Sequence, residues 1–217
     1  MNSAIILAGG IGKRLNSEIP KQFIRLDNGK RIIDFSIEAF KKNKNINEII
    51  IVLPPDWIDR YGSDYIDYTL VSGGKERYES SKEGLLACCP ESRNVLIHDA
   101  ARPLISQNLI DDCIYYLNQY DAVAPCIAAT DSLIEVDDEV SYLNRSNIKF
   151  IQTPQGFNKN LLLNVMAEIN NDVSDDMSAV LAYDKNINYK FFQGEVYNFK
   201  ITHDLDIKIF NNILNEK

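Results

Sequence analysis

The sequence Ala-Ile-Ile-Leu-Ala-Gly-Gly at residues 4–10 is a short apolar run that ends in two glycines. This pattern predicts a buried strand that enters a tight turn. Three further apolar runs are expected to form strands, at residues 48–53, 95–97 and 122–124. We expect Pro125 to end the last of them. Three segments between the strands have helical patterns, at residues 32–41, 79–87 and 109–117.

Strands that alternate with helices over short connections predict one α/β fold: a Rossmann-like, mostly parallel sheet with helices on both faces. The carboxyl ends of parallel strands meet at one edge of the sheet, where ligands bind. The glycine turn at residues 8–15 and the loop at residues 99–103 both follow predicted strands. We therefore expect the two segments to lie together at that edge.

The alternation of strands and helices is interrupted at residues 131–150. Two short apolar segments flank the acidic turn Asp137-Asp138-Glu139, which predicts a protruding β-hairpin arm. A two-stranded hairpin cannot bury its own apolar side chains, so the arm is expected to pack on a second copy of the chain in a homodimer. No repeat or linker is visible, so residues 1–217 are predicted to form a single domain, with residues 131–150 as its dimerisation arm.

Composition excludes several classes of protein. The chain has 217 residues, is 45% hydrophobic and carries a formal net charge of −8, which argues against a nucleic-acid partner. No stretch approaches the ~20 apolar residues of a membrane span, and the first residues lack the pattern of a signal peptide, so a cytoplasmic protein is expected. The four cysteines form no C-x-x-C pair and the chain has two histidines, which argues against zinc.

A glycine-rich loop with two cations follows the first predicted strand, at residues 7–15, Leu-Ala-Gly-Gly-Ile-Gly-Lys-Arg-Leu. Glycines let backbone N–H groups approach phosphates, and cations neutralise their charge. The loop is neither a Walker loop nor a dinucleotide fingerprint, because Leu15 stands where the fingerprint has its third glycine. Pro20 then stiffens the segment that presents Lys21. Taken singly, a structural turn and a solvated surface lysine remain alternatives.

Residues 7–23 resemble the nucleotide-binding signature of the cytidylyltransferases that act on polyol phosphates, which include the 2-C-methyl-D-erythritol 4-phosphate and ribitol-5-phosphate enzymes. The likeness continues in the family's order and spacing at residues 73–80, 98–103, 145, 152–157, 174–176 and 198–202. The resemblance implies transfer of CMP from CTP to a polyol phosphate with release of pyrophosphate. It favours 2-C-methyl-D-erythritol 4-phosphate, and hence isoprenoid precursor synthesis.

The resemblance also implies a role for each matched residue. The nucleotide-binding set is Ala8, Gly9, Gly10, Gly12, Gly74 and Ser80. The catalytic set is Arg14, Lys21, Asp99 and Lys200. The acceptor-binding set is Arg102, Arg145 and Ser174, with Arg145 carried by the arm into the active site of the second copy. Asp99 would also contact Mg²⁺ bound to the CTP phosphates.

The chemistry agrees with these roles. The attacking phosphate oxygen is already an anion, so catalysis needs positioning and charge neutralisation rather than a strong general base. A chain with two histidines suits this chemistry better than a catalytic triad. The charge of a triphosphate exceeds what Arg14 and Lys21 offset, which favours Mg²⁺ as a cofactor.

Some positions depart from the erythritol pattern and leave alternatives open. Lys75 replaces an acidic residue, and Ile134 and the Leu-Ala-Gly-Gly opening are closer to the ribitol-phosphate enzymes, which serve cell-surface polymer synthesis. A sugar-1-phosphate nucleotidylyltransferase that uses UTP shares the glycine loop, but residues 73–80 and 98–103 favour cytidine. A non-catalytic nucleotide-binding protein is the third alternative, against which the joint presence of Arg14, Lys21, Asp99 and Lys200 argues.

Overall fold

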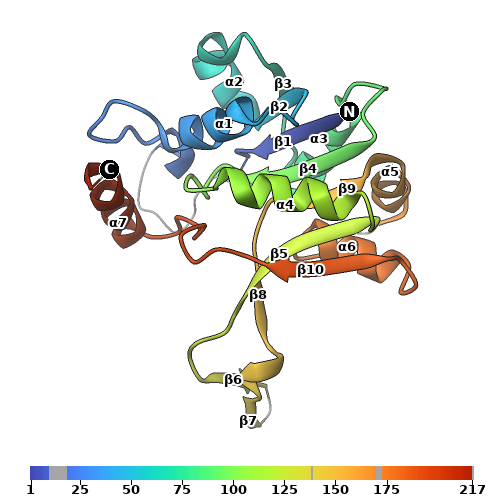
Figure 1. Cartoon of the computed structure of the whole chain (residues 1–217). Helices are drawn as coiled ribbons and strands as arrows, with labels where there is room; N and C mark the ends of the chain where they lie inside the picture. Colours follow the sequence, from blue (N-terminus) through green and yellow to red (C-terminus); the bar gives the residue numbers. More distant parts are fainter. Residues whose placement is uncertain (10–18, 138, 170–172, 217) are drawn as a thin grey trace.

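The computed structural model describes residues 1–9, 19–137, 139–169 and 173–216 (Figure 1). Its centre is an eight-stranded sheet in the order β10-β5-β9-β4-β1-β2-β3, with β8 paired to β5. The strands are β1 (Asn2–Leu7), β2 (Glu48–Leu53), β3 (Thr69–Ser72), β4 (Asn94–Asp99), β5 (Ala122–Ala128), β8 (Lys149–Ile151), β9 (Gln155–Asn158) and β10 (Tyr189–Gln193). The helices are α1 (Ile32–Lys42), α2 (Pro55–Tyr61), α3 (Arg77–Leu86), α4 (Gln107–Leu117), α5 (Lys159–Glu168), α6 (Asp176–Tyr183) and α7 (Asp204–Asn215).

The sheet is mostly parallel, as predicted. β1 lies parallel to β2 and β4, β2 lies parallel to β3, and β5 lies parallel to β10. The exceptions are β9, antiparallel to β4 and β5, and β8, antiparallel to β5. Pro125 does not end its strand, because β5 continues to Ala128. A proline fits there because its carbonyl oxygen, rather than the missing N–H, makes a bond, accepting from Gln152 N at 2.8 Å.

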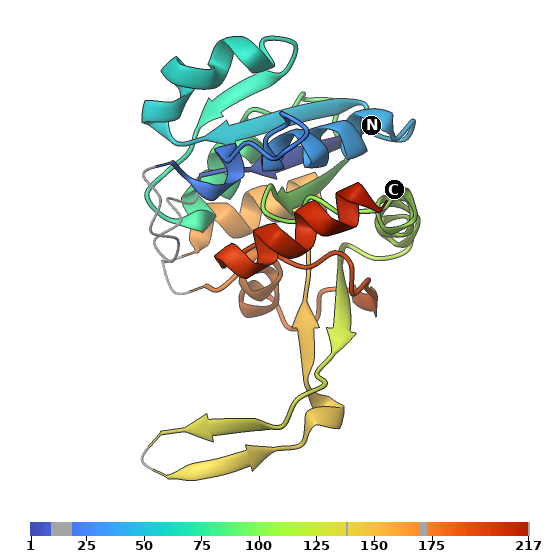
Figure 2. The same cartoon turned by 90° about the vertical axis from the view of Figure 1, so that its left-hand side faces the viewer.

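Helices cover both faces of the sheet, which confirms the predicted layers (Figure 2). The alternation of side chains along β1 divides the core. Ala4 and Ile6 pack with buried residues of α1 and α4, whereas Ile5 and Leu7 pack with those of α3, α5 and α6. α7 adds a smaller cluster in which Phe210 packs with Ile201 and with residues near α1. Among the described helices, none combines the length and the apolar character that crossing a membrane requires.

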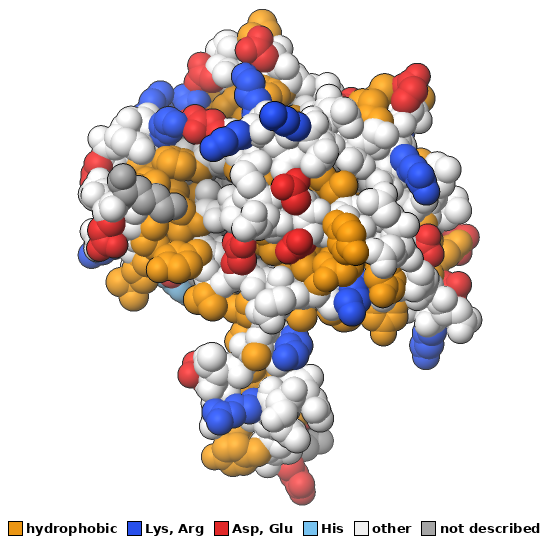
Figure 3. Space-filling view, viewed as in Figure 1, with side chains coloured by type: hydrophobic (Ala, Val, Ile, Leu, Met, Phe, Trp, Pro, Cys, Tyr) orange, Lys and Arg blue, Asp and Glu red, His pale blue; other side chains and the backbone are white. Residues whose placement is uncertain are grey.

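The predicted arm is present as the hairpin of β6 (Leu133–Val136) and β7 (Val140–Leu143), which pair antiparallel. It projects from the body of the molecule in both ribbon views (Figures 1 and 2). Hydrophobic side chains lie on its surface (Figure 3), and Tyr142 is 81% exposed. None of the described hairpin residues belongs to the buried clusters that form the core of the fold.

Candidate functional site

The carboxyl ends of four parallel strands meet at one edge of the sheet, and backbone hydrogen bonds join the loops that follow them. Ala8 N donates to Val52 O at 2.9 Å, and Ala100 N donates to Leu7 O at 3.0 Å. Gly73 N donates to Leu53 O at 2.7 Å. Ala8 and Gly9 after β1, the double glycine after β3 and the loop after β4 therefore lie side by side. The sequence predicted this for the segments after β1 and β4, although residues 10–15 of the first segment lie outside the described residues.

The predicted nucleotide-binding residues that the structure describes gather at the start of α3. Ser80 is buried, and a Cβ on Gly9 would lie 3.0 Å from its Oγ. A Cβ on Gly73 would lie 2.8 Å from the same atom, and one on Gly74 would lie 2.2 Å from Glu79 Cβ. Side chains larger than hydrogen do not fit at Gly73 and Gly74 without a shift. The close approach of backbone at a helix N-terminus suits the binding of a phosphate or a base.

Asp99 is the central acidic group of the described site. Its Oδ2 accepts from Lys200 Nζ at 2.7 Å, and its Oδ1 lies 3.3 Å from Arg77 Nε. Burial alone would raise the pKa of the Asp99 carboxyl, but the charges of Arg77 and Lys200 hold it well below its usual range. Asp99 is therefore ionised at neutral pH and is flanked by two cations.

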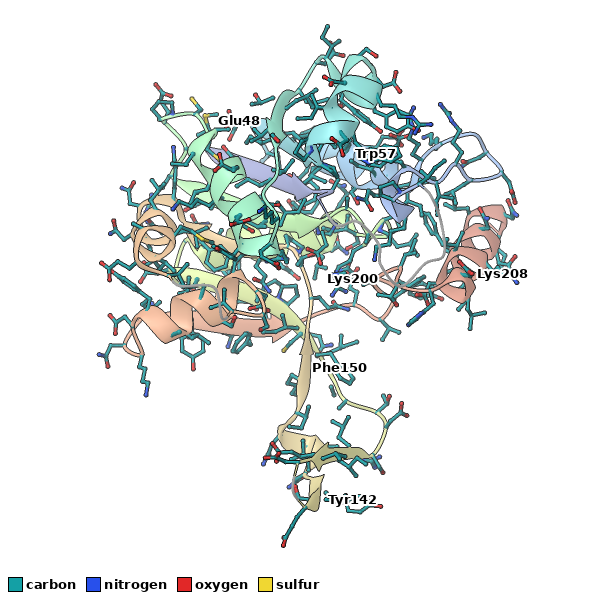
Figure 4. All side chains as sticks on the ribbon, turned by 180° about the vertical axis from the view of Figure 1, so that it is seen from behind. Glu48, Trp57, Tyr142, Phe150, Lys200 and Lys208 are labelled. Atoms are coloured by element: carbon teal, nitrogen blue, oxygen red, sulfur yellow. The ribbon has the colours of Figure 1, made fainter. Side chains whose placement is uncertain are left out.

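Arg77 connects Asp99 to a second carboxylate. Its Nη1 donates to Asp176 Oδ2 at 2.7 Å. Burial works against the charge of Arg77, but Asp176 and Asp99 outweigh it and hold the pKa of the guanidinium above its ordinary value. The described cluster thus alternates charges in the order Lys200, Asp99, Arg77, Asp176 (Lys200 is labelled in Figure 4).

A buried hydrogen-bond network supports the loop after β4. Thr153 Oγ1 accepts from Asp99 N at 3.1 Å and contacts His98 Nδ1 at 3.1 Å. His98 Nε2 lies 3.1 Å from Arg102 O, and burial lowers the pKa of His98 to about 4. Arg102 Nη1 donates to Asn198 O at 2.9 Å. His98 is therefore uncharged at neutral pH, and its two ring nitrogens contact Thr153 and Arg102, which gives it a structural role in orienting the loop.

Lys21 reaches the same edge from the loop before α1. It begins a turn of 3-10 helix, η1 (Lys21–Phe23), and its Nζ donates to Ile201 O at 2.6 Å, next to Lys200. The next residue, Gln22, is buried and donates from its side chain to Ala8 O. The ring of Phe23 stacks on Trp57, with 5.1 Å between centroids. These contacts hold the Lys21 backbone against the turn after β1.

The structure brings part of the predicted set together. Described residues at the common edge are Ala8, Gly9, Lys21, Gly74, Ser80, Asp99, Arg102 and Lys200. Ser174 is exposed, two residues before Asp176, and its Oγ donates to Ser178 Oγ at 3.3 Å. Arg145 is not in this cluster: it lies in the arm, in η3 (Arg145–Asn147), and donates to Thr130 O at 3.0 Å. Gly10, Gly12 and Arg14 lie outside the described residues.

Two charged residues of the cluster, Arg77 and Asp176, were not among the predicted site residues. Both lie within motifs that the sequence displays, residues 73–80 and 174–176. They are separated by 99 positions in the chain, so no local spacing predicts their ion pair. The available signal was their position: each is the first residue of a helix that follows a loop at the ligand edge.

The side chains at the edge show which kind of metal site this protein could form. Among the described residues there is no group of three or more His, Cys, Asp or Glu side chains that could hold one. Asp99 offers a single carboxylate at the edge where phosphates are expected. Mg²⁺ in nucleotide sites commonly takes one or two carboxylates and completes its shell with phosphate oxygens and water. The residues therefore fit an ion held mainly by the substrate and do not fit an all-protein metal site.

Comparison with known proteins gives one family along the whole chain. The family model "IspD: 2-C-methyl-D-erythritol 4-phosphate cytidylyltransferase" matches residues 2–216. The protein of that description from Clostridium botulinum (strain 657 / Type Ba4) is 36% identical over 227 residues, covering 98% of this chain and 97% of the relative. The one from Lachnospira eligens is 36% identical over 223 residues, covering 96% and 97%.

The solved structures agree with the sequence relatives. The crystal structure of 4-diphosphocytidyl-2C-methyl-D-erythritol synthase from Anaerococcus prevotii DSM 20548 superposes with a TM-score of 0.86 and 31% sequence identity. The match covers 100% of this chain and 96% of the other. The match is therefore one of the whole chain and not of a part of it.

Proposed function

The chain belongs to the 2-C-methyl-D-erythritol 4-phosphate cytidylyltransferase family, and from this premise we propose that it transfers CMP from CTP to 2-C-methyl-D-erythritol 4-phosphate and releases pyrophosphate. The observation that carries the proposal is the match to that family over residues 2–216, with no part of the site segments left out. The reaction is a step of isoprenoid precursor synthesis. The ribitol-phosphate alternative rests on a few positions such as Ile134, against a family match along the whole chain.

The arrangement of charges suits this reaction. A phosphate oxygen of the acceptor attacks the α-phosphorus of CTP in line, and the bond between that phosphorus and the oxygen bridging to the β-phosphate breaks. Lys21, which donates to Ile201 O, and the adjacent residue Lys200 would neutralise charge around the pentacoordinate transition state. The nucleophile needs no deprotonation, which is consistent with the buried, neutral state of His98 beside Asp99.

The two substrates would occupy neighbouring parts of the edge. Gly9, Gly74 and Ser80 would bind the nucleotide at the start of α3. Arg102 and Ser174 would bind the acceptor on the other side of Asp99. This division places Asp99 at the junction of donor and acceptor, where a fixed carboxylate orients cations and hydroxyl groups.

Magnesium is the cofactor we propose. Mg²⁺ bound to the triphosphate would offset the charge of the leaving pyrophosphate, with Asp99 as its protein ligand. The support is the ionised Asp99 carboxylate at the edge and the excess of phosphate charge over the cations of the described cluster. The acidic net charge of −8 makes general attraction of the substrate to the protein weak, so local cations must do the binding.

We further propose that the active form is a homodimer in which the arm carries Arg145 to the active site of a second copy. The support is the exposed apolar surface of the arm, with Val136, Val140 and Tyr142 all more than 60% exposed. Arg145 lies in this arm rather than near Asp99 of its own chain.

We also propose that the reaction takes place in the cytoplasm. The four cysteines are free, which suits the reducing conditions there.

The test is a pyrophosphate-release assay with CTP, UTP, ATP and GTP, each against 2-C-methyl-D-erythritol 4-phosphate, ribitol 5-phosphate, glycerol phosphate and a sugar 1-phosphate. We expect kcat/KM to be highest for CTP with the erythritol phosphate, and activity to stop in excess EDTA and return with Mg²⁺. A higher kcat/KM for ribitol 5-phosphate would reassign the acceptor. Equal turnover with UTP would refute the preference for cytidine, and no release with any pair would refute enzymatic function.

A further inference from the structure

Arg77 stands between two carboxylates that come from different parts of the chain. It is the first residue of α3, directly after the turn that is proposed to bind the nucleotide. Its Nε lies 3.3 Å from Asp99 Oδ1 and its Nη1 lies 2.7 Å from Asp176 Oδ2. Asp176 is the first residue of α6 and is 1% exposed. The start of each helix is therefore linked to the central carboxylate through one guanidinium.

The two cations that hold Asp99 differ in how firmly they are fixed. The Lys200 side chain is 39% exposed and comes from a loop, so it has room to change partner when substrate binds. The Arg77 side chain is anchored at its other end by a buried carboxylate that cannot turn toward water. A planar guanidinium bonded at two separate nitrogens also fixes direction, which an ammonium group does not. Arg77 is thus the rigid partner of Asp99.

Stability alone is a poor explanation for this pair. Buried ion pairs lose most of their attraction to the cost of removing both charges from water, and apolar side chains of the same volume often stabilise a protein as well. In the described part of the chain, Arg77 Nη2 and Asp176 Oδ1 are buried without a hydrogen-bond partner. The protein itself therefore leaves this pair partly unsatisfied, which makes the pair a weak contributor to stability. Its geometry suits the orientation of Asp99 better.

We infer that Arg77 and Asp176 are positioning residues for the proposed reaction: Asp176 fixes the guanidinium of Arg77, and Arg77 fixes the Asp99 carboxylate between the two substrates. The inference rests on the proposed function and adds two residues to its machinery. Neither residue needs to touch the reacting atoms, because both act through the orientation of Asp99.

The first test uses the variant Asp176→Asn, which keeps the shape of the side chain and removes its charge. We expect kcat to fall about tenfold or more, because a small displacement of a positioned group is costly in the transition state. The KM for CTP should change far less than kcat. Arg77→Lys should also lose activity, since it keeps the charge but not the two-sided fork. Wild-type kcat in both variants would contradict the inference.

The second test asks whether the effect passes through Asp99. In an Asp99→Asn background, adding Asp176→Asn should lower the residual rate by no more than about twofold, because the group being positioned is already gone. Radiolabelled CTP would keep such low rates measurable. If the two losses multiply in full, Asp176 acts independently of Asp99 and the positioning role is wrong.

Lys159→Met is the matched control for loss of a buried charge. Lys159 is buried, and its Nζ donates to Cys88 O and Cys89 O at 3.2 and 2.6 Å. It lies beside the start of β4, roughly 16 Å along the strand from Asp99. This variant should lower the Tm and leave kcat unchanged.

The outcomes separate the inference from the proposed function. A wild-type protein without activity would refute the function itself. An active wild-type protein whose Asp176→Asn variant loses only Tm, as the Lys159 control does, would refute the positioning role alone.

Discussion

At the scale of single residues, Lys21 is the side chain most directly tied to catalysis in the described site. Its turn is held by Gln22 against Ala8 and by the stacking of Phe23 on Trp57. Lys21→Ala should therefore leave the fold intact and lower kcat by about a hundredfold, as loss of one preorganised charge contact does. Lys44→Ala, which removes an exposed lysine between α1 and β2, is the matched control. An unchanged kcat in Lys21→Ala would make Lys21 a surface residue.

His98 gives a prediction for the dependence of stability on pH. Burial lowers its pKa to about 4 in the folded protein, against 6.5 when exposed, and it is surrounded by Asp99, Arg102 and Thr153. Between these values the unfolded chain binds a proton that the folded chain does not, so stability is full above pH 6.5 and falls as pH falls toward 4. The loss should reach about 3 kcal/mol.

Urea unfolding at several pH values measures this effect. The variant His98→Gln should flatten the curve between pH 6.5 and 5, a range above the ordinary pKa of carboxyl groups such as Asp99. A wild-type curve that is already flat there would show that His98 becomes charged in the folded state. In that case its contact with Arg102 O, rather than its burial, would determine its protonation.

Sequence could predict which residue types lie at the site but not how they pair. Asp99 and the glycines follow apolar strands, so their edge of the sheet was predictable from chain order. The role of Arg77 was not, because its partners Asp99 and Asp176 are brought to it only by the tertiary fold. An ion pair between residues far apart in the chain depends on how the loops lie in the folded protein, and the local sequence pattern does not contain this information.

At the scale of elements, α3 packs directly on the sheet at Gly84. A Cβ there would lie 2.5 Å from Ile5 Cγ2 and 2.9 Å from Val52 Cγ2, both side chains of the sheet core. Gly84→Ala should gain about 1 kcal/mol of helix propensity but lose about 1 to 3 kcal/mol through overpacking. We expect a net loss of stability. A raised Tm would show that the helix shifts outward without cost.

The control for this prediction is Leu86→Ala, an exposed position in the same helix. It should change the free energy of unfolding little, because its side chain is 60% exposed. Because α3 begins with Arg77 and carries Ser80, an outward shift in Gly84→Ala should also lower kcat. The Tm and kcat of Gly84→Ala can be measured on the same purified protein.

Elements with a strong apolar signal were predictable, and short ones without it were not. β2 was predicted with the bounds that the structure has, and α1 and α4 differ from prediction by one or two residues at one end. β3 was missed because it has four residues, of which the two end residues are polar and exposed. β9 was missed because Gly156 interrupts its apolar pattern, while the close packing of Cys113 and Leu117 on that glycine is visible only in three dimensions.

At the scale of the whole molecule, the exposed apolar side chains of the arm have no partner surface in the described part of the single chain. Tyr142 lies on the arm, remote from Lys200 in the body of the same chain (Figure 4). We expect light scattering to give twice the 24.7 kDa mass of the chain. Val140→Ser combined with Tyr142→Ser should convert the dimer to a monomer with a stable core, because both side chains are exposed in the single chain. A monomeric wild-type protein at micromolar concentration would rule out the dimer.

Complementation tests whether two copies share each site. The variant Arg145→Ala alone should raise the KM for the acceptor more than the KM for CTP.

Mixing Arg145→Ala chains with Lys21→Ala chains should restore activity, since one site of each mixed dimer would contain both residues intact. With random exchange, about one quarter of the sites recover. No recovery after confirmed exchange would place Arg145 outside the active site.

The central claim is that this chain joins CMP to 2-C-methyl-D-erythritol 4-phosphate, and the product measures it most directly. Incubation with CTP, the acceptor and Mg²⁺ should be followed by ³¹P NMR, with Lys21→Ala as the slow control. The account predicts two coupled resonances of a new diphosphate diester, with pyrophosphate formed in equal amount. Pyrophosphate with CMP and no diester, or an unchanged spectrum, would contradict it.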